Sequence, residues 1–203
     1  MASEIEFFFD YVSPYSYLAD VQLKGLCERT GATIAYRPML LGGVFKATGN
    51  VSPIFEKCEA KRAYGLKTLR RWVALRGAPF QMNPHFPINS VALMRTAIAA
   101  QQAGVFATTH VATFQAMWVD GKDLGNPEVI REVMDAAGVD GAALLAATQT
   151  DAVKQGLIAA TEEAVRRGAF GVPTFCLGDE MFWGQDHLAL LEARLTGKLP
   201  AVA

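Results

Sequence analysis

The sequence predicts an α/β fold in which one four-stranded sheet is covered by helices. Three observations support this: a β-α-β pattern over residues 1–41, a helical pattern over 42–168, and a β-β-α pattern over 169–203. Neither terminal unit can bury both faces of its strands alone, so we expect the two to share one sheet. The expected division is a sheet-containing domain made of 1–41 and 169–203, with 42–168 as an all-helical insertion domain.

The first unit begins with the apolar run Ile5–Phe9, which predicts a strand buried on both faces. Ser13 is a good N-cap residue and Pro14 suits the first helical position, so a helix is expected from Pro14 to a stop at Gly31. Ala32–Leu41 predicts a second strand, and the proline within it favours either an edge position or an irregularity late in the strand. The connection should be right-handed and the two strands parallel.

The middle of the chain shows helical spacing of apolar residues, with Gly or Pro at each junction. The expected helical stretches are Ile54–Arg76, Asn89–Ala103, Val105–Val119, Pro127–Ala137 and Asp151–Arg167.

The last unit predicts a hairpin followed by a helix. Val172–Leu177 and Glu180–Trp183 have strand composition, and Gly178-Asp179 between them indicates a turn. Gln185–Leu195 then places leucines on one helical face.

Composition excludes several classes of function. The 203 residues carry 19 basic and 20 acidic side chains, so no strong field attracts nucleic acid or anionic lipid. No apolar run approaches the roughly 20 residues that span a membrane, and no secretory signal precedes the first strand. The three cysteines and three histidines are scattered, without metal-ligand or disulfide spacing. We therefore expect a cytoplasmic protein with no metal, no nucleic acid partner and no membrane contact.

The βαβ…ββα order, with a short Pro-containing turn before the first helix, is similar to the thioredoxin fold. Redox proteins of that fold carry Cys-x-x-Cys at this turn, where the helix N-terminus stabilises a thiolate. Here the tetrapeptide is Ser13-Pro14-Tyr15-Ser16, so the chain cannot exchange a disulfide of its own there. Val172-Pro173 matches the position where this fold usually has a cis X-Pro bond; the sequence leaves its isomer open.

Five segments together carry a more specific resemblance: FFFDYVSPYSYLA, TGNVSP, FPINS, FGVPTF and GDEMFWGQD. In this order they resemble the 2-hydroxychromene-2-carboxylate isomerase family, which is related to the kappa-class glutathione transferases. The resemblance covers essentially the whole chain. It implies a thioredoxin-like fold with a helical insertion, glutathione as cofactor, a small aromatic substrate and a homodimer.

The resemblance also implies roles for the residues around the first helix. Ser13 would face the glutathione sulfur and stabilise it as a thiolate, because a hydroxyl donor and a helix N-terminus both favour the anion. Val172, which precedes Pro173, would pair through its backbone with the cysteinyl part of glutathione. The alternative for Ser13 is a purely structural N-cap.

Further residues are implied at the two ends of the ligand. The γ-glutamyl end would lie against Trp183, Gly184, Gln185 and Asp186. Asp186 would accept from the α-ammonium group, although an ordinary helix cap is the alternative for it.

Three polar residues lie in the segments that the resemblance assigns to substrate and cofactor. Asn50 would contact glutathione, and Lys46 and Asn89 would contact the substrate, with Lys46 holding its carboxylate. A solvated surface side chain is the alternative for Lys46, and a helix cap is the alternative for Asn89.

Three functions are therefore open from the sequence. The first is glutathione-dependent isomerisation of 2-hydroxychromene-2-carboxylate or a related aromatic keto acid, by reversible thiolate addition. The second is a kappa-type glutathione transferase or peroxidase that consumes the same thiolate. The third is a non-catalytic thiol-peptide binder, whose affinity for glutathione would not depend on Ser13.

Overall fold

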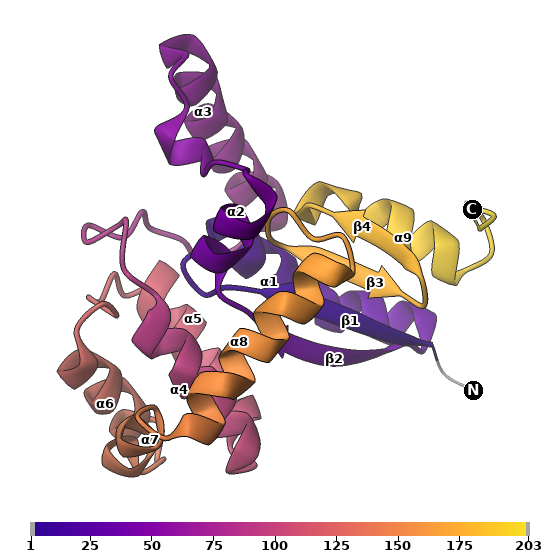
Figure 1. Ribbon diagram of the computed structural model, residues 1–203. Helices are drawn as coiled ribbons and strands as arrows, with labels where there is room; N and C mark the ends of the chain where they lie inside the picture. The colour runs from indigo at the N-terminus through magenta and orange to yellow at the C-terminus, as the bar shows by residue number, and fades with distance from the viewer. Residues whose placement is uncertain (1–2, 202–203) are drawn as a thin grey trace.

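A computed structural model describes residues 3–201 and contains one mixed four-stranded sheet of order β2-β1-β3-β4 (Figure 1). The strands are β1 (Glu4–Phe9), β2 (Thr33–Pro38), β3 (Thr174–Leu177) and β4 (Glu180–Trp183). β1 is parallel to β2 and antiparallel to β3, and β3 is antiparallel to β4. The shared sheet, the parallel first pair, the edge position of β2 and the hairpin are all confirmed.

Two helices belong to the terminal units, namely α1 (Pro14–Thr30) and α9 (Leu188–Leu195). The other helices lie between β2 and β3: α2 (Leu41–Thr48), α3 (Glu59–Arg76), α4 (Val91–Gln102), α5 (Phe106–Trp118), α6 (Pro127–Ala136), α7 (Gly141–Ala147) and α8 (Asp151–Arg166). Two short 3₁₀ turns, η1 (Pro53–Phe55) and η2 (Gln185–His187), precede α3 and α9.

The structure corrects several predicted boundaries. The second strand was expected to reach Leu41, but it ends at Pro38 and Leu41 begins α2. A proline at the end of the strand cannot donate to the ladder, which favours this early end. The last helix begins at Leu188 rather than Gln185, because the intervening residues form η2.

The helical segment also differs in detail. The helix expected from Ile54 begins only at Glu59, after η1 and an irregular stretch. The helix expected from Asn89 begins at Val91. Helices α2 and α7 were not predicted individually, because short helices of eight and seven residues leave little periodic signal.

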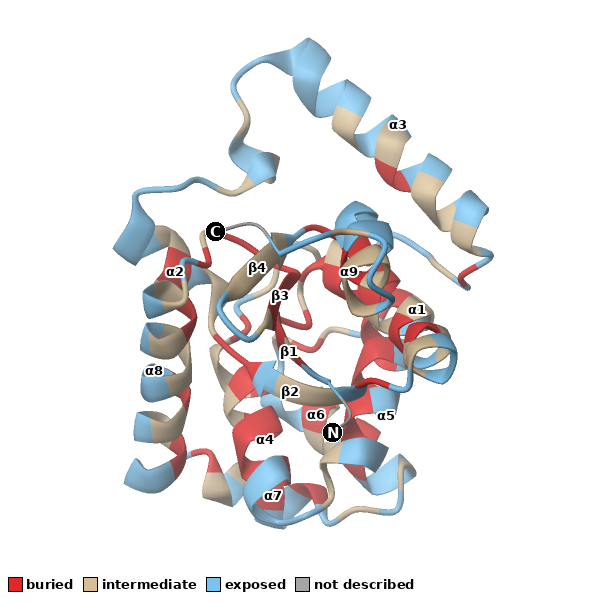
Figure 2. Cartoon of the chain, turned by 90° about the vertical axis from the view of Figure 1, so that its right-hand side faces the viewer, coloured by how far each residue is buried: buried red, intermediate tan, exposed pale blue. Residues whose placement is uncertain are grey.

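Both faces of the sheet are covered, as the run of phenylalanines predicted. Phe7 and Phe9 point into the larger core, with residues of α1 and α5. Phe8 points the other way, into a smaller core with Val44 of α2 and Ala164 of α8. Buried residues accordingly concentrate around the strands and the helix faces beside them (Figure 2). Helices α2 and α8 of the expected insertion pack against the sheet and share a core with it. The division into a sheet-containing domain and a helical domain stays a prediction.

Helix α3 departs from the rest of the molecule and projects away from it (Figures 1 and 2). Leu69 is its one buried residue among those described. Several large apolar side chains on or near it are exposed: Val51, Phe55, Tyr64, Leu66 and Leu75.

Candidate functional site

The N-terminus of α1 is built around Ser13. Ser13 has extended backbone angles (φ −94°, ψ 116°), and its Oγ accepts a hydrogen bond from the amide of Ser16 at 3.2 Å. Pro14 occupies the first turn of the helix, where its missing N–H costs nothing. Ser13 is buried, with 6% of its surface exposed. Within residues 3–201 its hydroxyl accepts a hydrogen bond and donates none.

Ser16 provides a second unused hydroxyl at the same helix end. It is fully buried, and its Oγ has no hydrogen-bond partner among the described residues. A buried hydroxyl without a partner costs roughly 1–3 kcal/mol. The two serines therefore leave two hydroxyl protons available at the positions where redox proteins of this fold carry thiols.

The Val172-Pro173 bond directly precedes β3, and this bond is cis. The carbonyl of Pro173 accepts from the amide of Gly184 at 2.9 Å, so the start of β3 is tied to the turn that follows β4. Val172 is buried in the smaller core.

That turn also packs against α1. Gln185 is buried, and its Oε1 accepts from the side-chain amide of Gln22 in α1 at 3.3 Å. Burial raises the pKa of Tyr15, and the nearby negative charge of Asp186 raises it further. Asp186 thus lies close to the first turn of α1. The first turn of α1 therefore lies near η2, and the residue before β3 is tied to the turn that leads into η2.

Asn50 and Trp183 meet at the segment just before the cis bond. The side-chain amide of Asn50 donates to the carbonyl of Phe170 at 2.7 Å. The rings of Phe170 and Trp183 lie 4.8 Å apart, and a Cβ on Gly171 would approach Trp183 Nε1 to 2.9 Å. Trp183 is still 42% exposed, so its ring remains accessible beside this backbone.

The two residues predicted to bind substrate are less closely connected to the rest. Lys46 is exposed in the last turn of α2 and forms no ion pair within residues 3–201. The Oδ1 of Asn89 accepts from the amide of Val91, the first residue of α4, at 3.0 Å, and Ser90 is the N-cap residue of that helix. Neither observation tests a contact with substrate.

Comparison with known proteins identifies the family. A family model for the DSBA-like thioredoxin domain matches residues 4–196. A 2-hydroxychromene-2-carboxylate isomerase of Sphingobium xenophagum is 33% identical, over 96% of this chain and 99% of that protein. Glutathione S-transferase kappa 1 of Homo sapiens is 29% identical, over 96% and 91% of the two chains.

A solved structure of a 2-hydroxychromene-2-carboxylate isomerase superposes with a TM-score of 0.81, at 32% identity, over 98% of this chain and all of that one. The chain belongs to the 2-hydroxychromene-2-carboxylate isomerase family, within the DSBA-like thioredoxin proteins. The resemblance given by the sequence motifs is confirmed, and so is the fold.

Membership of this isomerase family, with kappa-class transferases as further relatives, makes the chain an enzyme. In such an enzyme the geometry around Ser13 provides hydroxyl donors, a helix N-terminus and an adjoining carboxylate. No helix in the described part of the chain is long and apolar enough to cross a membrane.

Sequence reasoning missed Asp10, three residues before Ser13. Asp10 is fully buried, and burial raises its pKa to about 6 although three hydrogen bonds to its carboxyl oppose the shift. Its carbonyl accepts from the amide of Ser13 at 3.1 Å. A carboxylate directly after a buried strand was the available signal.

A second missed group lies around His110. Its Nδ1 is 3.0 Å from the hydroxyl of Tyr11, and its Nε2 is 2.9 Å from Asp20. Burial raises the pKa of Tyr11 well above its ordinary value, and the charge of Asp20 contributes. Because Trp118 Nε1 also donates to the Tyr11 carbonyl at 2.8 Å, this buried network fixes the loop before Ser13.

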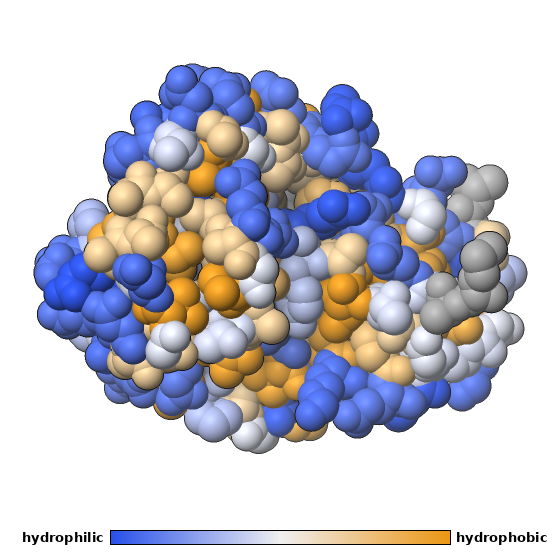
Figure 3. Space-filling model, turned by 90° about the horizontal axis from the view of Figure 1, so that it is seen from below, coloured by the Kyte–Doolittle hydropathy of each residue, from blue (hydrophilic) through white to orange (hydrophobic). Residues whose placement is uncertain are grey.

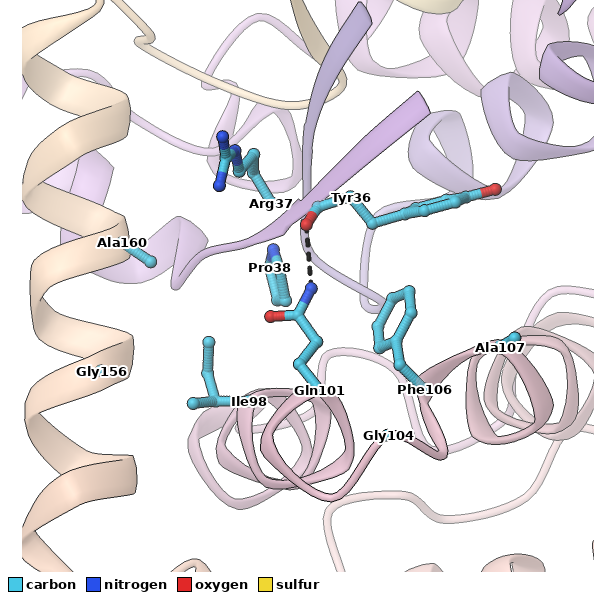
Figure 4. A pocket seen from close by; sticks show the side chains of 10 residues that line it. All are labelled: Tyr36, Arg37, Pro38, Ile98, Gln101, Gly104, Phe106, Ala107, Gly156 and Ala160. Carbon is cyan, nitrogen blue, oxygen red and sulfur yellow. Dashed lines mark hydrogen bonds between the residues drawn. The ribbon is translucent and has the colours of Figure 1, made fainter. Parts of the chain in front are cut away.

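A cavity of about 560 Å³ lies elsewhere, beside the edge strand β2. Gln101 reaches from α4 to the Tyr36 carbonyl at 2.9 Å on its wall, with the ring of Phe106 nearby (Figure 4). On the side of the molecule where β2 lies, apolar surface is broken up by polar residues (Figure 3). None of the predicted site residues lines this cavity, and we assign it no role.

Proposed function

We propose that this enzyme is a glutathione-dependent isomerase of 2-hydroxychromene-2-carboxylate or a related aromatic keto acid, in which Ser13 holds the glutathione sulfur as a thiolate. The relatives at 33–34% identity that carry this isomerase name, and that align over nearly the whole chain, support the reaction. The chemistry at the N-terminus of α1 supports the cofactor.

One observation carries the proposal: Ser13 is a buried N-cap whose oxygen is already an acceptor and whose proton has no acceptor among the residues that the structure describes. A ligand that only accepts, such as a thiolate, complements this hydroxyl. An ordinary thiol has a pKa of about 8.5. Lowering it by about 2 units requires roughly 3 kcal/mol. A charge-assisted hydrogen bond and the helix dipole together supply about that much.

The remaining residues fit the polar groups of a tripeptide. The backbone of Val172, beside the cis bond, would pair with the cysteinyl residue, while Asp186 would accept from the α-ammonium group and the Gln185 amide would donate to the α-carboxylate. Trp183 would cover the ligand. Asn50 is engaged with Phe170, so we propose that it supports the ligand-binding backbone as well as contacting the ligand.

When bound, glutathione would supply a sulfur nucleophile that adds reversibly to a conjugated carbon of the substrate. The chain's own contribution is to keep that sulfur ionised, exclude water around it and orient the substrate. Lys46 would pair with the substrate carboxylate, and Asn89 would face its polar groups.

The decisive experiment follows the amount of glutathione needed. With 2-hydroxychromene-2-carboxylate as substrate, catalytic amounts of glutathione should sustain complete conversion, and the total glutathione should be unchanged at the end. In parallel, ultraviolet thiolate absorbance should show that bound glutathione ionises at lower pH than free glutathione. Full turnover without glutathione would contradict the proposal.

A kappa-type glutathione transferase or peroxidase is the second candidate, and the kappa-class relatives at 29% and 28% identity favour it. This function consumes glutathione. Conjugation to a chloronitroaromatic acceptor, or reduction of a peroxide, with stoichiometric loss of the thiol would identify it. A non-catalytic thiol-peptide binder would turn over none of these acceptors.

We further propose a homodimer in which α3 contacts a second copy of the chain. Six basic residues and one acidic residue lie on α3, whereas the whole chain has a net charge of −1, so the rest of the chain is acidic and complements it. Its exposed Tyr64, Leu66 and Leu75 would be covered in the dimer. Light scattering should give twice the mass of the chain, and Leu66→Glu should give the monomer.

A cytoplasmic location is part of the same proposal. The three cysteines, Cys27, Cys58 and Cys176, are all free thiols. Unpaired cysteines are usual in a reducing compartment, where glutathione is also available as the thiol. Fractionation of cells that express the protein should recover it with the cytoplasmic contents.

A further inference from the structure

Asp10 lies where a charged carboxylate is energetically unfavourable. It is fully buried, and its oxygens accept from the amides of Val12 at 3.2 Å and Leu41 at 3.0 Å and from the hydroxyl of Ser90 at 2.9 Å. Within residues 3–201 these partners are neutral, and none is a cation. A buried carboxylate without a cation lowers stability, so a role other than stability accounts for it best.

The three partners come from three different parts of the fold. Val12 lies in the loop between β1 and α1, Leu41 is the first residue of α2, and Ser90 precedes the first residue of α4. The carbonyl of Asp10 also accepts from the amide of Ser13. One residue therefore joins the loop that presents Ser13 to two helices of the inserted segment.

The chemistry of these contacts requires a group that only accepts. Two amides and a hydroxyl all donate, and an ionised carboxylate offers acceptors alone, whereas an asparagine would turn its NH₂ towards at least one donor. Protonation would likewise replace an acceptor with a donor. The Ser90 hydroxyl would then have to accept rather than donate, so all three groups donate to Asp10 only when it is ionised.

We propose that Asp10 is a positioning residue for the reaction at Ser13. Its ionised carboxyl group fixes the loop between β1 and α1, which carries Ser13, relative to α2 and α4. The inference rests on the proposed function. Asn89 lies next to Ser90, and Lys46 lies on α2. The hydrogen bonds of Asp10 therefore also connect the loop that carries Ser13 to the two segments that carry the proposed substrate-binding residues.

Few titratable groups surround Asp10 in the described part of the chain, so its own titration can be followed. In the loop, Tyr11 is the titratable neighbour, and its pKa is raised by burial first and only in small part by Asp10. From α2 and α4, the groups on the carboxyl are an amide and a hydroxyl, which do not titrate. Burial holds the pKa of Asp10 at about 6, and the Ser90 hydrogen bond acts against that rise.

The test compares pH profiles of kcat, at saturating glutathione, for the wild type and three variants. Ser90→Ala removes the hydroxyl that stabilises the carboxylate, so the acid limb near pH 6 should move upward by about half a unit. Thr96→Ala is the matched control, since Thr96 is a buried hydroxyl of the same helix that donates to the Ala92 carbonyl. Its profile should coincide with that of the wild type.

Asp10→Asn should lower kcat about tenfold and leave KM for glutathione within about threefold. It should also lose the contribution of Asp10 to the acid limb, so that the remaining limb reports the bound sulfur alone. If Asp10→Asn does not fold, the Ser90→Ala profile decides alone. Superimposed profiles for Ser90→Ala and Thr96→Ala, with an active wild type, overturn the inference but not the proposed function. A wild type that is inactive with glutathione overturns the proposed function, and this inference with it.

Discussion

Helices α1 and α8 both begin with a hydroxyl N-cap, but the two caps lie in different surroundings. Ser13 and Thr150 are both N-cap residues, and each hydroxyl oxygen accepts from the amide three residues later, at 3.2 and 3.4 Å. Thr150 is exposed, and its proton is donated to the Ala147 carbonyl at 2.8 Å. Ser13 is buried, and its proton has no acceptor within residues 3–201.

The difference is the one expected between a structural cap and the binding group that we propose Ser13 to be. A hydroxyl that serves only to cap a helix can satisfy its remaining hydrogen-bonding capacity locally or in water. Ser13 leaves it open inside the fold, next to Ser16, whose hydroxyl is also unpartnered. Native proteins rarely leave such groups unpaired without a reason, and a ligand that accepts hydrogen bonds is one.

Replacing the two caps should therefore have very different effects on catalysis. In Ser13→Ala we expect kcat to fall about 100- to 1000-fold, as when a donor to a developing or stabilised anion is removed. Affinity for glutathione should fall only modestly, because the hydrogen bond matters most to the ionised sulfur. Steady-state kinetics and calorimetry measure the two quantities separately.

Thr150→Ala is the control for this prediction and should keep wild-type kcat, since Thr150 caps a helix on the surface. Near-wild-type turnover in Ser13→Ala would remove the basis of the proposed mechanism. Equal losses in both variants would mean that helix capping, rather than the sulfur contact, limits the activity.

The same contrast extends to two carboxylates, one of them buried and the other exposed. Asp140 is an exposed N-cap whose Oδ1 accepts from the Ala143 amide at 2.8 Å, whereas Asp10 is buried. Burial raises the pKa of Asp10 from 3.8 to about 6. The folded state thus binds this proton more tightly than the unfolded state, which stabilises the fold below pH 4, and that stability is lost as pH rises through 6.

Two pKa units correspond to about 3 kcal/mol, so the wild type should lose about this much relative to Asp10→Asn between pH 4 and pH 7. Urea unfolding at several pH values measures the difference. A constant difference between wild type and Asp10→Asn would show that Asp10 does not titrate in the folded protein.

The fold was predictable because its signals are local and agree with one another. Three consecutive phenylalanines, a Ser-Pro helix start and a Gly-Asp turn define the strands, α1 and the hairpin, and the topology follows from sharing one sheet. The sequence could place Ser13, Val172 and Asp186 in one site only through the resemblance. Asp10 escaped notice because its partners, Leu41 and Ser90, are 31 and 80 residues away.

Two glycines allow a finer version of the comparison, and one of them, Gly184, lies in the turn that we propose binds the γ-glutamyl end of glutathione. Gly184 has φ 102° and is buried, and a Cβ there would approach Asp186 Oδ1 to 2.5 Å. Gly31 has φ 72° at the exposed end of α1, with nothing within 4 Å of such a Cβ. Alanine at Gly31 incurs backbone strain of about 1–2 kcal/mol, and alanine at Gly184, whose φ 102° and ψ 145° lie near a region that essentially only glycine adopts, incurs up to about 3 kcal/mol.

Only Gly184→Ala should also displace Asp186 and lower glutathione affinity, by about tenfold if one charge-assisted contact is lost. Calorimetric titration of both variants measures this. Gly31→Ala should bind glutathione as the wild type does. Unchanged affinity in Gly184→Ala would argue against a ligand contact at Asp186.

The smallest expected difference is between the free energies of unfolding of the two N-cap variants. Loss of a hydroxyl N-cap costs about 1 kcal/mol, so Ser13→Ala and Thr150→Ala should have similar free energies of unfolding in urea. Two further effects at Ser13 oppose each other. The buried Ser16 amide loses its acceptor, which destabilises the variant, but a buried hydroxyl with an unused proton is also removed, which stabilises it. A much larger loss in Ser13→Ala would mean that the hydroxyl proton has a structural partner within the protein and is not held for a ligand.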